Sequence, residues 1–189
     1  MSALRTATWP SHQRLEKRID FKARLATLTS YRLHLEGMWG FYVAAESRLC
    51  SGIFGHWLTD YAARRKAPML EHDILCLGAE PAGLNALARC PFVPQCDDPQ
   101  AAFGCAYVLE GATLGGRTLL PVVETRLGLS AHHGGAFLAS YGEAVGDMWR
   151  SFGQALERCC ATQQDRGRAA AAASATFFAL ERWLCAPRP

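Results

Sequence analysis

Apolar side chains recur along this chain at intervals of three and four residues, which is the spacing of one face of an α-helix. Ala, Leu, Arg and Glu are common and β-branched residues are few, a composition that favours helices. No segment carries a convincing strand pattern. The sequence therefore predicts an all-α fold.

Proline and glycine clusters interrupt the helical pattern and divide the chain into segments. Asp98, after a proline-containing loop, is a candidate N-terminal cap, and Gly128 is a candidate C-terminal stop. The expected helices cover about residues 6–19, 21–50, 60–79 with a break near Pro68, a short segment 84–90, 99–127, 136–160 and 165–185. His132-His133-Gly134-Gly135 is expected to form a connecting turn or to begin the next helix.

Size and charge limit the class of protein. At 189 residues, with half of them apolar, the chain can bury one sizeable core, so we expect a single domain over residues 1–189. The formal net charge is +3 and neither sign forms a long block, which argues against a nucleic-acid partner. The start lacks a signal-peptide pattern and no run of about eighteen apolar residues occurs, so we expect a cytoplasmic protein without a membrane partner.

Eight cysteines are scattered along the chain, and none are spaced C-x-x-C. A chain of this size does not need disulfides for stability. We therefore expect reduced, mostly buried thiols, with a redox-active vicinal pair at Cys159 and Cys160 as the less favoured alternative.

His12 and Glu16 are four residues apart, so they lie one turn apart on the same helix face. A metal-bound imidazole commonly donates its second ring N–H to a carboxylate, which fixes the ring and makes it a stronger ligand. The pair fits an axial iron ligand with a supporting carboxylate. The alternative is an ordinary solvated His–Glu pair on a surface helix.

Gly111, Gly115 and Gly116 lie inside a segment that otherwise has a helical pattern. Each interior glycine costs a helix about 1 kcal/mol relative to alanine, so a compensating use is expected. The first two share one face, where the backbone is bare. Either a flat macrocycle or a closely packed neighbouring helix would suit that face.

Several ordered motifs resemble the heme oxygenase family and cover nearly the whole chain. Leu4 to Thr8 followed by His12 to Glu16 resembles the family's proximal helix, and Tyr107 to Gly116 is similar to its distal helix. The segments Arg126 to Leu129, Ser140 to Gly142, Met148 to Phe152 and Phe177 to Glu181 also follow in family order. The chain looks most like the bacterial branch that supplies biliverdin to bacteriophytochromes.

The resemblance implies a single-domain heme oxygenase-like helical bundle that binds heme between the proximal and distal helices. His12 would be the proximal iron ligand, Glu16 its supporting partner, and the backbone of Gly111, Gly115 and Gly116 the distal wall. Arg150 and Arg5 match basic positions that bind the heme propionates. Ordinary surface charge is the alternative for both arginines.

The implied reaction is the oxidative cleavage of heme b, which is both substrate and cofactor, to biliverdin, CO and ferrous iron. It uses O2 and electrons from a ferredoxin or a flavoprotein reductase. The expected product is biliverdin IXα, and a bacteriophytochrome is a candidate recipient. Iron acquisition is the alternative purpose.

Two positions depart from the family pattern. Ala112 stands where animal-type relatives carry an aspartate that anchors the distal water network, so backbone carbonyls and bound water would have to hold that network. Ala106 stands at the position of the family's distal tyrosine, near the propionates. Because of these departures, the position at which heme is cleaved stays open. A non-catalytic heme carrier or sensor of the same fold also stays possible as an alternative function.

Two other classes of protein are alternatives to a heme protein. A helical interaction protein that binds no heme is the third hypothesis, after the enzyme and the heme carrier or sensor. A di-iron oxidase is disfavoured because the sequence has no Glu-x-x-His pair. The remaining histidines, each without a partner at metal-ligand spacing, are expected to be structural: His34, His56, His72, His132 and His133.

Overall fold

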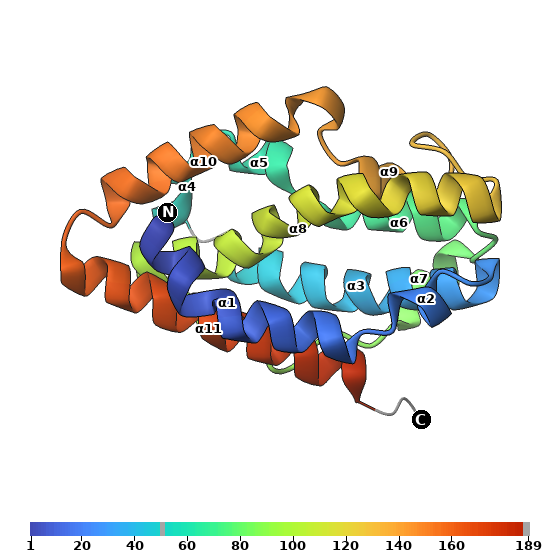
Figure 1. Cartoon of the computed structure of the whole chain (residues 1–189), viewed down its shortest axis with the longest axis horizontal. Helices are drawn as coiled ribbons and strands as arrows, with labels where there is room; N and C mark the ends of the chain where they lie inside the picture. The colour runs from blue at the N-terminus through green and yellow to red at the C-terminus, as the bar shows by residue number, and fades with distance from the viewer. Residues whose placement is uncertain (50–51, 187–189) are drawn as a thin grey trace.

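The computed structural model describes residues 1–49 and 52–186, which form helices joined by short connections (Figure 1). The elements are α1 (Ser2–Arg18), α2 (Phe21–Arg24), α3 (Leu28–Leu49), α4 (Gly52–Trp57), α5 (Tyr61–Arg64), α6 (Ala67–Cys76), α7 (Pro81–Ala86), α8 (Pro99–Leu127), α9 (Ala136–Ala139), a 3-10 turn (Gly142–Ala144), α10 (Val145–Cys159) and α11 (Gln163–Cys185). The described residues contain no strand, and their β-bridges are isolated ones from Ser130 to His133 and to Gly134. The all-α prediction is confirmed.

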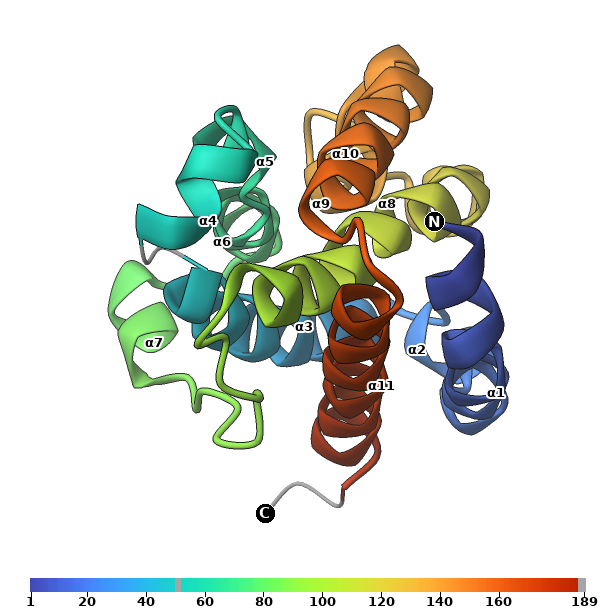
Figure 2. The same cartoon turned by 90° about the vertical axis from the view of Figure 1, so that its left-hand side faces the viewer.

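Helix α8 runs through the middle of the molecule and contacts α3, α4, α9, α10 and α11. Viewed along the molecule, α10 lies on one side of α8 and α11 on the other, while α1 packs against α11 at the periphery (Figure 2). Figure 1 shows that α8 is not straight but bends between its two halves. The proximal and distal helices of the sequence prediction are thus separate walls of one bundle.

Buried aromatic rings join the central helices. Phe103 of α8 contacts Phe54 of α4 at 4.9 Å between ring centroids and Phe152 of α10 at 5.7 Å. All three side chains are fully buried. Burying a large apolar side chain contributes about 1.5–3 kcal/mol, so this cluster is a principal reason that α8 holds its central place.

The ends of α8 agree with the prediction. The Asp98 carboxylate accepts a hydrogen bond from the N–H of Ala101 at 2.7 Å, and Pro99 begins the helix. At the other end Gly128 has φ of +69°, a left-handed conformation that glycine adopts without strain. Local cap residues were therefore sufficient to define this long helix.

The predicted first helix begins too late and the predicted second helix is too long. Helix α1 starts at Ser2 rather than Thr6, which leaves Pro10 inside the helix, and because proline has no N–H it cannot donate to the carbonyl of Thr6. The segment 21–50 divides into α2 and α3, with Cys50 outside the described residues. Thr27 and Ser30 exchange backbone-to-hydroxyl hydrogen bonds at 3.1 Å, which caps the start of α3.

The break predicted near Pro68 in the segment 60–79 is confirmed, since α5 ends at Arg64 and α6 begins at Ala67. The Glu46 carboxylate of α3 accepts the N–H groups of Lys66 and Ala67 and caps α6 there. Two other predicted segments differ. The segment 136–160 is divided at Ser140, whose φ is +50°. The short segment 84–90 is α7, displaced toward Pro81, and α4 was not predicted.

The cysteines are unpaired in the described part of the chain, and most are buried. Burial and the neighbouring Cys160 raise the pKa of Cys159 to about 12, which keeps this thiol protonated and unreactive near neutral pH. All seven cysteines that the structure describes are free, and five of them are buried, in agreement with the expectation of mostly buried thiols. No helix among the described residues is both long and apolar enough to cross a membrane.

Candidate heme cleft

A cavity of about 650 Å³ lies between α1, α8 and α10. Its lining residues are Met1, Ser2, Arg5, Thr6 and Trp9 at the N-terminus and in α1, Tyr107 of α8 and Trp149 of α10. The volume falls within the range of about 300–1,000 Å³ that is usual for small-molecule sites. Three aromatic side chains and one cation give it the character of a site for a flat, anionic ligand.

His12 and Glu16 project together from α1. Nδ1 of His12 lies 3.4 Å from Oε2 of Glu16, and the two side chains are 45% and 60% exposed. This separation is longer than an ordinary N–H···O hydrogen bond, and Nδ1 is a buried atom without a hydrogen bond to any described residue. An imidazole nitrogen that has no hydrogen bond and lies next to a carboxylate fits a metal ligand with a supporting acceptor.

Aromatic contacts fix the orientation of the His12 ring. The Trp9 indole lies parallel to it, with 5.9 Å between centroids and 6° between planes. Phe177 of α11 meets the ring edge-on at 5.8 Å. Trp9 also lines the cavity, whereas His12 and Glu16 are not among the residues that line it.

The three candidate glycines of α8, Gly111, Gly115 and Gly116, do not share one role. A methyl group at position 115 would meet nothing within 4 Å, and one at position 111 would meet only Cη2 of Trp149, at 3.9 Å. At position 116 it would lie 2.5 Å from the carbonyl oxygen of Leu138 in α9. Gly116 therefore serves helix packing, whereas Gly111 and Gly115 leave a bare face. That face continues from Tyr107, because the three residues are spaced four apart.

The two candidate arginines lie in different surroundings. Arg5 lines the cavity. The Arg150 side chain is 70% exposed, its Nη1 donates to Oδ1 of Asp147 at 2.6 Å, and it is not among the lining residues. The structure therefore brings Arg5 together with the aromatic walls but does not bring Arg150 to them. The role of each arginine remains a prediction.

Sequence reasoning missed the aromatic walls. Tyr107 is four residues before Gly111, and that spacing is the signal that could have placed it on the same face. Its ring lies 5.5 Å from that of Trp149 across the α8–α10 contact. Ala106, at the position of the family's tyrosine, is buried on another face, so the neighbouring Tyr107 is the tyrosine that reaches the cavity.

Other histidines form structural contacts. Nδ1 of the buried His34 lies 3.3 Å from Nη1 of Arg24, and Nε2 of His72 lies 3.3 Å from the carbonyl oxygen of His132. Among the described residues, no three His, Cys, Asp or Glu side chains are grouped so that they could hold a metal ion.

Comparisons with known proteins agree with this geometry. The model of the heme oxygenase family matches residues 1–186. A solved heme oxygenase from Leptospira interrogans has a similar structure, with a TM-score of 0.78, 15% identity and 97% of each chain covered. The NO- and CO-bound heme oxygenase from Neisseria meningitidis gives a TM-score of 0.73 and 19% identity, with 96% of this chain and 87% of that chain covered.

A search of curated protein sequences gave no match. The two structural similarities lie below 25% identity and establish the fold, while the family model spans nearly every residue. The chain belongs to the heme oxygenase family.

Proposed function

We propose that this protein degrades heme b to biliverdin, CO and ferrous iron, using O2 and electrons from a ferredoxin or a flavoprotein reductase. The observation that carries the proposal is the 650 Å³ cavity between His12-bearing α1 and the bare face of α8, in a chain of this family. When bound, the heme supplies the iron at which oxygen is activated and is itself the substrate.

His12 of α1 would hold the heme iron. Glu16 accepts the second ring N–H, directly or through a water, because the 3.4 Å separation needs only a small adjustment. Trp9 and Phe177 hold the imidazole plane before the ligand arrives, which reduces the ordering cost of binding.

On the distal side Gly111 and Gly115 let the ligand approach the α8 backbone closely. Because residue 112 is an alanine without a carboxylate, backbone groups would have to hold the water that supplies protons. Tyr107 and Trp149 cover the cavity wall beside Gly111 and exclude bulk water there. Gly116 contributes by letting α9 pack closely against α8.

Arg5, which lines the cavity, would bind a propionate, because an arginine can form two parallel hydrogen bonds to a carboxylate. Arg150 would bind the second propionate only after its ion pair with Asp147 breaks. Because that ion pair is exposed to solvent, breaking it costs little free energy. We further propose biliverdin IXα as product and a bacteriophytochrome as its recipient, on the resemblance alone.

A heme carrier or sensor is the second candidate function. The specific observation in its favour is Ala112, since the carboxylate that animal-type relatives use near the bound oxygen is missing. Such a protein would bind heme through His12 in the same cavity but would not consume it.

Heme titration followed by reduction under oxygen separates the two functions. The purified chain should give a sharp Soret band with one equivalent of heme. Added ferredoxin, its reductase and NADPH should then replace that band with the absorption of biliverdin. A Soret band that persists through this treatment would support the carrier instead, and absence of any Soret band would refute both.

A further inference from the structure

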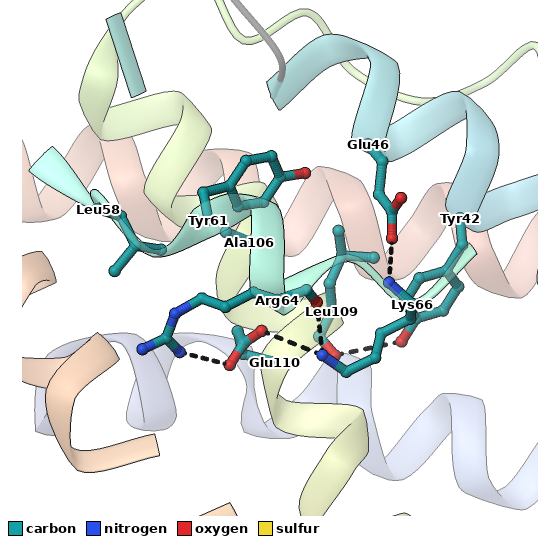
Figure 3. Close-up of a pocket in the computed structure, with 9 residues that line it drawn as sticks. All are labelled: Tyr42, Glu46, Leu58, Tyr61, Arg64, Lys66, Ala106, Leu109 and Glu110. Atoms are coloured by element: carbon teal, nitrogen blue, oxygen red, sulfur yellow. Dashed lines mark hydrogen bonds and ion pairs between the residues drawn. The ribbon is translucent and has the colours of Figure 1, made fainter. Parts of the chain in front are cut away.

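Figure 3 shows a cluster of charged side chains around Glu110 of α8. The residues that line this cluster's pocket are all different from those that line the heme cleft. Glu46 of α3, Arg64 of α5, Glu110 of α8 and Lys66 before α6 have side chains that are 1–6% exposed. Tyr141 completes the cluster, which surrounds a cavity of only about 10 Å³. That space is the size of one water molecule, so the cluster is closed to any substrate.

Glu110 stands immediately before Gly111 and is fully engaged. Its Oε2 accepts from Nη1 of Arg64 at 2.9 Å, and its Oε1 accepts from the hydroxyl of Tyr141 at 2.7 Å. Nζ of Lys66 lies 3.7 Å from Oε1. Burial lowers the pKa of Lys66 to about 8, although Glu110 and Glu46 oppose that shift.

Arg64 uses all five of its N–H donors. Nε and Nη2 donate to the Asp60 carboxylate, both at 2.8 Å, and Nη1 donates to Glu110. The remaining two bonds reach α10: Nη1 to the carbonyl of Met148 at 3.0 Å and Nη2 to the hydroxyl of Ser151 at 2.7 Å. One guanidinium thus joins α5, α8 and α10.

The α10 residues that Arg64 binds flank the wall of the cleft. Trp149 follows Met148, lines the cavity and lies beside both Tyr107 and position 111 of α8. The ion pair therefore fixes α8 through Glu110, the residue before Gly111, and fixes α10 on both sides of Trp149.

Stability alone does not explain a buried ion pair, because the cost of removing both charges from water offsets most of their attraction. Directional hydrogen bonds do explain it, since a saturated guanidinium permits one arrangement of its partners. We infer that the Glu110–Arg64 pair is a positioning device for the heme cleft, which sets the separation between Gly111 on α8 and Trp149 on α10. That the cleft holds heme rests on the proposed function, whereas the positioning of α8 and α10 does not.

The first test uses the protein without heme. Hydrogen–deuterium exchange is measured for peptides covering residues 107–116 and 145–153 in the parent, Glu110→Gln and Arg64→Lys. Glu110→Gln removes the carboxylate charge, and Arg64→Lys removes the forked guanidinium, while each variant keeps a side chain of similar length. The exchange rate in these peptides should rise by about tenfold or more. Unchanged protection in both peptides would overturn the inference.

Glu181→Gln is the matched control. The Glu181 side chain is 5% exposed, against 6% for Glu110, and it also binds two arginines, Arg14 and Arg18. Its loss should raise exchange in α1 and the end of α11 and leave residues 107–116 and 145–153 unaffected. An equal rise in those two peptides would mean that any buried carboxylate has this effect, which would also overturn the inference.

Ser151→Ala serves if the charge variants fail to fold, because it removes only one hydroxyl from the α10 end of the network. Faster exchange confined to residues 145–153 supports the positioning role, and no change contradicts it.

The second test uses bound heme and separates the two proposals. Glu110→Gln should keep the Soret band of the His12 complex while the share of minor biliverdin isomers rises at least about twofold. An unchanged isomer distribution would refute the positioning of the cleft. If the parent itself binds no heme, the proposed function fails, and the exchange experiment still decides the role of the ion pair.

Discussion

Replacing Gly115 by alanine should stabilise the protein without heme and weaken its affinity for heme. Nothing in the fold lies within 4 Å of a methyl group at this position, which is exposed and inside α8. The full helix-propensity gain of about 0.8–1.0 kcal/mol should therefore appear as higher stability. For a chain of this size that corresponds to a rise in Tm of roughly 2–4 °C.

The same methyl group would stand on the bare face where the proposal places the ligand. Overpacking there should cost about 1–3 kcal/mol of binding free energy, or a 5- to 150-fold rise in Kd. The assay pairs calorimetry of the protein without heme with a heme titration followed at the Soret band. Opposite signs for stability and affinity are the expected signature.

Two other glycines supply controls. Gly167→Ala in α11, which also meets nothing within 4 Å, should stabilise the protein by a similar amount and leave heme affinity unchanged. Gly116→Ala should destabilise it, because the new methyl group would lie 2.5 Å from the backbone oxygen of Leu138. If Gly115→Ala lowers Tm, or binds heme as tightly as the parent does, the assignment of this face to the ligand is wrong.

Two further predictions concern helix ends and pH. Asp98→Ala should lower the free energy of unfolding by about 1 kcal/mol in denaturant titration, because the cap of Ala101 is lost, whereas Asp98→Asn should keep most of it. Burial alone would raise the pKa of Glu181, but hydrogen bonds from Arg14 and Arg18 lower it below 4.5. This carboxylate therefore contributes stability above pH 4.5 that is lost as pH falls through its lowered pKa. The stability gap between the parent and Glu181→Gln should close over that acidic range, and a gap that widens there would contradict the assignment.

Local signals allowed the sequence to predict the bounds of α8 and the adjacency of His12 and Glu16 on one helix face. Asp98, Pro99 and Gly128 act within their own helix ends, and His12 with Glu16 depends only on one turn of helix. Because these features depend only on residues that are close along the chain, the amino-acid sequence is enough to predict them. The reciprocal hydrogen bonds of Thr27 and Ser30, which separate α2 from α3, are local as well, although the sequence predicted one continuous helix there.

The buried cluster could not be predicted in this way. Arg64 and Lys66 stand in a run that has the pattern of an exposed basic turn, and Glu110 is 46 residues from Arg64. Burial of these charges depends on partners that meet only after the helices pack. The same limit applies to Gly116, whose use depends on the carbonyl of Leu138, and to Trp149, whose place in the cleft depends on how α10 docks.

Ligation of heme iron by His12 is the central claim, and the ferric heme complexes of the parent and His12→Ala test it most directly. Resonance Raman spectra should show an iron–imidazole bond in the parent and none in the variant. Added free imidazole should restore the parent-like spectrum, because it can occupy the space left beside Trp9 and Phe177. Identical spectra of the parent and the variant before imidazole is added would contradict the account, since another residue would then hold the iron.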